Sequence, residues 1–187
     1  EPNDHVAVQG TYASYTSNFS IDVNGVSASA SNGTFTATSV PLSGGSNNVT
    51  ATVATVDGLS DTHTIWLTLN RPPVAEAGSN RNVIAGYGVT LDGRNSYDPE
   101  GALITYRWYF ASRPAGSASS LVNLTSVTPS FVPDFPGSYP VSLVVNDGVH
   151  DSLPDNVTVT AAANSPPTAT AGPDQSVEPG TVTLSGS

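Results

Sequence analysis

The chain has 187 residues, which is too long for one small β domain and suits two. Its formal net charge is -10, and its five basic residues are scattered arginines. No basic patch therefore exists that could hold nucleic acid or an anionic membrane surface. The absence of cysteine excludes disulfides, thiol catalysis and thiolate metal sites. No apolar run approaches the ~18 residues that a membrane-spanning helix needs.

The first third of the chain alternates apolar and polar residues with a period of two, between turns rich in Gly, Asn and Ser. This pattern predicts short antiparallel strands packed as a sandwich. We expect strands at residues 5–10, 18–23, 26–31, 34–40, 47–57 and 63–70. Asn24-Gly25 suits a two-residue type I′ hairpin, because both central residues take positive φ. We expect Phe19, Ile21, Val23, Phe35 and Ala37 in the core, with Trp66 as its anchor.

The stretch FSIDVNGVSASASNGTFTATSVPLSGGSNNVTATVATVDG lies within this region. It resembles the bacterial Ig-like modules of secreted glucan hydrolases and surface proteins. The resemblance covers roughly residues 5–70, so residues 1–69 are interpreted as a bacterial Ig-like domain.

A long repeat organises the rest of the chain. NRPPVAEAGSNRNV, beginning at Asn70, returns as NSPPTATAGPDQSV, beginning at Asn164, and VTLDG at Val89 returns as VTLSG at Val182. The offset is about one β-sandwich domain. Residues 70–163 are therefore expected to form one domain. Residues 164–187 are expected to be the first strands of a further repeat, incomplete, or a strand that is exchanged with another subunit.

Three alternating segments supply the core of residues 70–163. They are Val89 with Leu91, residues 104–108 with the aromatic anchor Trp108, and residues 139–145. Tyr139, just after Pro136-Gly137, suits a corner hydrogen bond to the backbone. The expected fold class is all-β, with tandem immunoglobulin-like antiparallel β-sandwiches.

Two stretches of this repeat carry a second resemblance. RPPVAEAGSNRNVIAGYGVTLDGRNSYDPEGALITYRWYF and FVPDFPGSYPVSLVVNDG resemble the polycystic-kidney-disease (PKD) domain, an Ig-like sandwich. The resemblance implies calcium binding near the DPEG loop. The family pattern usually has an acidic residue directly after DPEG, where this chain has Ala102.

Oxygen-bearing side chains are expected to gather at the end of this sandwich that faces the first domain. The loops at residues 95–101 and 146–151 meet there in an Ig-like fold. Calcium takes six to eight oxygen ligands, which predicts a site made by Asn70, Asp98, Glu100, Asp147 and Asp151. Calcium is the one cofactor expected. The alternative is that these residues only form turns and keep the surface soluble.

Nothing in the sequence predicts an enzyme. The three histidines, His5, His63 and His150, lie near different strand ends, and no GxSxG motif occurs. They are expected to be surface residues, because a zinc site needs three or four converging ligands. An enzyme would also need a cleft with clustered titrating groups.

Glycan attachment is a second candidate modification. Five Asn-x-Ser/Thr sequons occur, at Asn18, Asn32, Asn48, Asn123 and Asn156. In a chain so rich in Ser and Thr, sequons also arise by chance. The five sequons are therefore either glycan attachment sites or chance matches, and both hypotheses stay open.

These features predict a non-catalytic structural module of a secreted or cell-surface repeat protein, acting in spacing, adhesion or filament assembly. Its expected partners are copies of itself or neighbouring repeats of a longer chain, with surface polysaccharide as a further candidate. The alternative is an accessory module of a secreted hydrolase that binds carbohydrate or protein. A row of exposed aromatic residues would favour that alternative; the candidates are Tyr12, Tyr15, Tyr87, Tyr97 and Tyr109.

Overall fold

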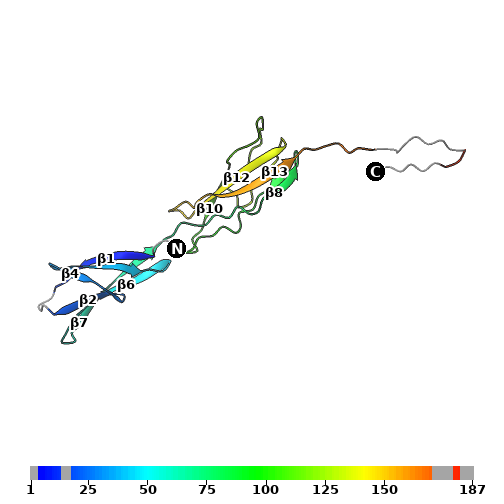
Figure 1. The fold of residues 1–187 in the computed structure, drawn as a ribbon. Coiled ribbons are helices and arrows are strands. Elements are labelled where there is room, and N and C mark those ends of the chain that lie inside the picture. The colour runs from blue at the N-terminus through cyan, green and yellow to red at the C-terminus, as the bar shows by residue number, and fades with distance from the viewer. Residues whose placement is uncertain (1–3, 14–17, 170–178, 182–187) are drawn as a thin grey trace.

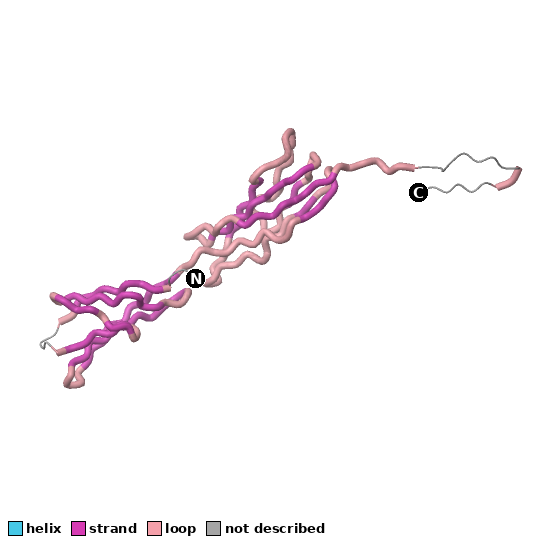
Figure 2. Tube along the Cα trace, in the orientation of Figure 1, coloured by secondary structure: helices cyan, strands magenta, loops and turns pink. Residues whose placement is uncertain are grey.

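The computed structural model describes residues 4–13, 18–169 and 179–181. In this part of the chain all regular secondary structure is β, in strands β1 to β13. Figure 1 shows two groups of strands arranged end to end, and Figure 2 shows that a single extended crossing of the chain joins them. The predicted all-β class is confirmed. In the described residues no helical segment has the length and apolar character needed to span a bilayer.

The first group of strands forms a sandwich of two sheets. One sheet has the order β1-β5-β4, from β1 (His5–Thr11), β5 (Thr34–Pro41) and β4 (Ser29–Ser31). The other has the order β3-β2-β6-β7, from β3 (Val26–Ser27), β2 (Phe19–Val23), β6 (Gly45–Thr55) and β7 (Ser60–Leu69). The segment predicted as one strand at residues 26–31 is two strands, because the chain crosses from one sheet to the other at Ala28.

The hairpin between β2 and β3 has the predicted turn. Asn24 and Gly25 have φ values of 48° and 85°, and Val23 pairs with Val26 across them. Two positive φ values give the turn a twist that matches the twist of the flanking strands.

The core of this sandwich contains the predicted aliphatic residues but not the predicted tryptophan. Val23 and Ala37 are fully buried, and Ile21 and Phe35 nearly so. Trp66 is 70% exposed, so the prediction that it anchors the core is wrong. Successive side chains of a strand point to opposite faces. On β7, the alternate residues Leu67 and Leu69 pack against the core. Trp66, which precedes Leu67, therefore points outward.

The second group forms another sandwich. Its larger sheet has the order β10-β12-β13-β8, from β10 (Thr105–Phe110), β12 (Gly137–Asn146), β13 (Asp155–Ala162) and β8 (Arg81–Ile84). Its smaller sheet pairs β11 (Ser130–Phe131) with β9 (Val89–Thr90). The first strand, β8, lies parallel to the last, β13, with Ala161 opposite Val83.

The second core has the predicted inward faces. Its largest fully buried side chains are Trp108, Tyr139 and Phe131. The indole Nε1 of Trp108 donates to the Ser126 carbonyl at 3.1 Å, so its polar atom is satisfied although it is buried. The Tyr139 hydroxyl donates to the Phe135 carbonyl at 2.8 Å, which is the expected corner hydrogen bond. The other predicted core residues Val89, Leu91, Val141, Leu143 and Val145 are buried, and Ile104 and Tyr106 are partly buried.

After β13 the chain leaves the second sandwich, as Figure 1 shows. Residues 163–169 and 179–181 are exposed and belong to no strand. Residues 170–178 and 182–187, where the predicted further repeat or exchanged strand falls, lie outside the described residues.

Candidate functional site

The junction between the sandwiches is held by Arg71. β7 ends at Leu69, so Arg71 is placed where the chain passes from one sandwich to the other. Its guanidinium forms an ion pair with Asp4, which precedes β1, and a second with Glu100 at 3.3 Å. Its backbone N–H donates to the other Glu100 oxygen at 2.9 Å. One cation thus joins carboxylates from both sandwiches.

Gly44 lies directly beside the Arg71–Glu100 ion pair. A Cβ atom on Gly44, in the turn between β5 and β6, would collide with the Glu100 carboxylate and would lie 2.8 Å from the Arg71 guanidinium. With glycine at this position, neither flexible side chain has to move aside for the Arg71–Glu100 ion pair to form next to the turn.

A second polar cluster stands beside the first. The Asn70 side-chain amide donates to Asp147 Oδ2 at 2.7 Å and lies 3.1 Å from His150 Nδ1. The other oxygen of Asp147 accepts from the backbone N–H groups of His150 and Val149 at 2.6 and 2.7 Å. These donors stabilise the carboxylate, chiefly the His150 N–H, and lower the Asp147 pKa to about 2 although burial acts in the opposite direction.

Asp98 is the buried carboxylate of this end. Only 8% of the residue is exposed. Its Oδ1 accepts from the backbone N–H groups of Glu100 and Ala102 at 3.0 and 2.9 Å, which holds the DPEG turn closed. Its Oδ2 is buried and has no hydrogen-bond partner, an arrangement that costs free energy unless a donor or a cation approaches it.

The five predicted calcium ligands therefore lie at one end of the second sandwich but do not form one coordination shell. Glu100 is engaged by Arg71, and Asp147 by Asn70 and two backbone donors. Asp151 accepts from Asn146 at 2.8 Å and faces Arg107 at 3.7 Å. Within the described ranges no group of three or more His, Asp or Glu side chains could hold a metal ion. The feature that suits a calcium ion is the buried Oδ2 of Asp98, which has no hydrogen-bond partner.

The sequence interpretation missed Asp4, Gly44 and Arg71. The repeat held one signal: the second copy of the N-x-P-P junction has Ser165 where the first has Arg71. A charged residue that appears in only one of two otherwise matching junctions points to a contact specific to that junction. Nothing in the sequence pointed to Asp4 or Gly44.

The remaining candidates are dispersed. The three histidines are exposed, and so are the asparagines of all five sequons. Tyr87, Tyr97 and Tyr109 are exposed but come from two loops and β10, whereas Tyr12 packs against the first core. Tyr15 lies outside the described residues. The exposed tyrosines therefore do not form a row on one strand.

Comparison with known proteins identifies the second sandwich. The family profile described as "PKD domain" matches residues 70–161, the segment that contains Arg71, Glu100 and the Asn70–Asp147 cluster but not Asp4 or Gly44. No curated protein matches the chain.

Several solved structures are similar to parts of the chain. A nucleoside hydrolase-related hypothetical protein of Saccharophagus degradans, associated with carbohydrate metabolism, is 21% identical over 50% of this chain, with a TM-score of 0.44. The chain covers only 26% of that protein. The PKD domain of the KIAA 1837 protein is 27% identical over 50% of this chain and 90% of its own, with a TM-score of 0.42. The fibronectin(III)-like modules of Clostridium thermocellum CbhA are 16% identical over 86% of this chain and 87% of their own, with a TM-score of 0.37.

Proposed function

Because residues 70–161 belong to the PKD domain family, we propose that the chain is a non-catalytic extracellular structural module. Its role is to hold neighbouring domains or partners at a set distance and angle, in adhesion or assembly at a cell surface. An Ig-like sandwich offers sheet faces and strand edges for contact with neighbouring domains, which suits such a role.

The observation that carries this proposal is the braced junction. Interfaces between domains of one chain usually allow relative motion unless they are large and apolar. Here a short connection with two prolines, Pro72 and Pro73, restricts the backbone. Arg71 then joins both sandwiches through its two ion pairs, and Gly44 leaves room for the pair with Glu100. Such a junction favours one angle between the sandwiches, as a spacer requires.

Small-angle X-ray scattering tests the proposal. We expect the wild type to give one extended shape, and Arg71→Ala or Gly44→Ala to give a broader distribution of maximum dimensions. Arg94→Ala is the matched control, because Arg94 is an exposed arginine paired only within its own loop, with Asp92 at 3.7 Å. If both junction variants scatter like the wild type and the control, the contacts of Arg71 and Gly44 do not set the angle between the sandwiches.

A single exposed tryptophan favours the alternative role in binding polysaccharide. Trp66 lies on the outer face of the four-stranded sheet, directly opposite Asn48 and two residues from Thr64. An indole face stacks on sugar rings while hydroxyl and amide groups hydrogen-bond to sugar hydroxyls. Retardation in gels that contain soluble glucan, lost in Trp66→Ala, would support this role.

Calcium binding stays a prediction, supported by the unpartnered oxygen of Asp98. A calcium ion there would need further oxygens, and Glu100, the nearest carboxylate in sequence, already accepts from Arg71 through both of its oxygens. Arg71 and calcium are therefore expected to compete for the same carboxylate.

A further inference from the structure

The two sandwiches differ at one edge. In the second, β8 pairs in parallel with the last strand, β13, and the side chains of β13 that face the core, Val157, Val159 and Ala161, are at most 4% exposed. In the first, the last strand is β7, and among the described residues no strand pairs with its outer edge. The position that β8 fills in one sandwich has no occupant in the other among the residues that the structure describes.

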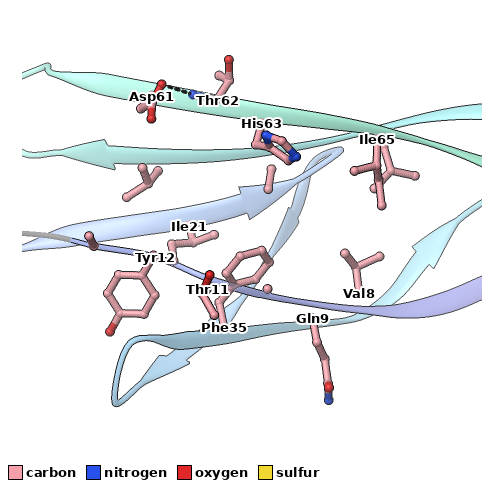
Figure 3. A pocket seen from close by; sticks show the side chains of 15 residues that line it. Val8, Gln9, Thr11, Tyr12, Ile21, Phe35, Asp61, Thr62, His63 and Ile65 are labelled. Carbon is pink, nitrogen blue, oxygen red and sulfur yellow. Dashed lines mark hydrogen bonds between the residues drawn. The ribbon is translucent and has the colours of Figure 1, made fainter.

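The uncovered face of β7 opens into a groove. β7 pairs with β6 so that Ile65 lies opposite the buried Val49, and His63 opposite Ala51. Side chains at these positions face the inside of the sandwich, yet Ile65 is 41% exposed. The groove has a volume of about 570 Å³ and lies between the edge strands β1 and β7. In Figure 3, Val8 on β1 and Ile65 on β7 point toward each other across it.

We propose that this groove accepts an extended strand from residues 164–187 of a second copy of the chain. We choose this occupant because the sequence repeat aligns residues 164–187 with the segment that contains β8. Residues 175–178 align with the β8 segment, residues 81–84, and share its valine, with Val177 in the place of Val83. Val83 packs against the core in the second sandwich. The donor segment is therefore a second version of the strand that fills the equivalent position beside β13.

The chemistry of the groove suits strand addition. An edge strand offers unpaired backbone N–H and C=O groups, and apolar positions on alternate residues give specificity. The exposed stretch of β7 from Asp61 to Ile65 is about as long as β8, which has four residues. The side chain of Val177 would cover Ile65 as Val83 covers part of the second core.

Such a contact joins two different surfaces of each copy and does not close on itself, so it generates a linear array. This inference rests on the proposed structural role and names its partner. Each copy carries a net charge of -10, so copies repel at low ionic strength. Salt screens that repulsion, and assembly is expected to increase with salt concentration.

Engineered disulfides test the contact directly, because the chain contains no cysteine of its own. Ile65→Cys protein is mixed with Val177→Cys protein and oxidised. We expect a disulfide-linked dimer to form at least tenfold faster than with Trp66→Cys, the next residue on β7 and one that faces outward. His63→Cys serves as a second acceptor variant if Ile65→Cys does not fold. Equal or faster linkage through Trp66→Cys overturns the proposal.

Light scattering provides an independent test. The mean mass of the wild type is expected to rise with protein and salt concentration, and Val177→Asp is expected to remain monomeric. Ser176→Asp adds the same charge one residue earlier, on the opposite face of the donor strand, and should still assemble. A wild type that stays monomeric throughout overturns the inference. The junction proposal is measured on dilute monomers by scattering shape, so either proposal can fail alone.

Discussion

Arg71 shows how one side chain can set the relation between two domains. The Arg71 and Asp4 side chains are both partly exposed, at 30% and 28%, so solvent screens this ion pair and its contribution to stability is small. Glu100 is more buried, with 9% of its side chain exposed. The main effect of the two ion pairs is directional, because the two carboxylates, Asp4 and Glu100, belong to different sandwiches. Losing the pairs is therefore expected to change the angle between the sandwiches more than the stability of either.

Asp147 makes stability depend on pH at the same junction. Its pKa in the folded protein is about 2, below the ordinary value of 3.8. A lowered folded-state pKa stabilises the fold above the unfolded-state pKa, and this contribution disappears as the pH falls through the folded-state pKa. We predict that Asp147→Asn is less stable than the wild type at pH 5 to 7, and that the difference shrinks between pH 4 and pH 2. Urea unfolding at a series of pH values measures it.

Asp134 provides the internal comparison for that experiment. The hydroxyls of Ser117 and Ser119 hold its pKa far below the ordinary value, and its site lies near the Tyr139 corner, away from the junction. It is unchanged in Asp147→Asn, so the variant should still lose stability in acid, but less steeply. A constant difference between variant and wild type across this pH range would contradict the role given to Asp147.

At the scale of elements, the β2–β3 hairpin depends on its two left-handed residues. Gly25 has a φ of 85°, and a Cβ there would meet no other atom within 4 Å. Any cost of Gly25→Ala is therefore backbone strain alone. We predict a loss of about 1 kcal/mol, measured by urea unfolding.

The effect of Gly25→Ala should be confined to the first sandwich, because the two hydrophobic cores are separate clusters. Fluorescence of the buried Trp108 reports on the second sandwich, whereas Trp66 is 70% exposed and its emission is expected to change little. Far-UV circular dichroism follows both sandwiches. Ser27→Ala, an exposed position in the same hairpin, is the control. A matching shift in the Trp108 transition would show that the sandwiches unfold as one unit.

The strands themselves were largely predictable, because alternation of apolar and polar residues reports directly on a half-buried sheet. The phase of that alternation was harder where β7 runs through His63, Ile65 and Trp66. Hydrophobicity favours the large indole for the inside, but register with β6 places Ile65 opposite the buried Val49. A shift of one residue reverses every side chain of a strand, so the neighbouring strand decided which residue faces inward.

On the scale of the whole molecule, the proposed calcium site would draw on Glu100, a carboxylate that Arg71 already engages. If calcium binds at Asp98, saturating calcium should raise the melting temperature of the second sandwich above its value with excess chelator. We predict that the shift is lost in Asp98→Asn and larger in Arg71→Ala, because removing the guanidinium frees Glu100. Differential scanning calorimetry of the wild type, Asp98→Asn and Arg71→Ala measures the three shifts in melting temperature. A shift below about one degree in the wild type and in Arg71→Ala would contradict calcium binding.

By itself, the sequence determined the all-β class, the repeat and the end at which polar loops gather, since these follow from local periodicity and from chain order in a sandwich. Only the tertiary structure decided how that end is used. Asp4, Gly44 and Arg71 are far apart in sequence, and no periodicity relates them; they meet because the last strand of one sandwich leads directly into the next. The uncovered edge of β7 also became visible only beside its covered counterpart, β13.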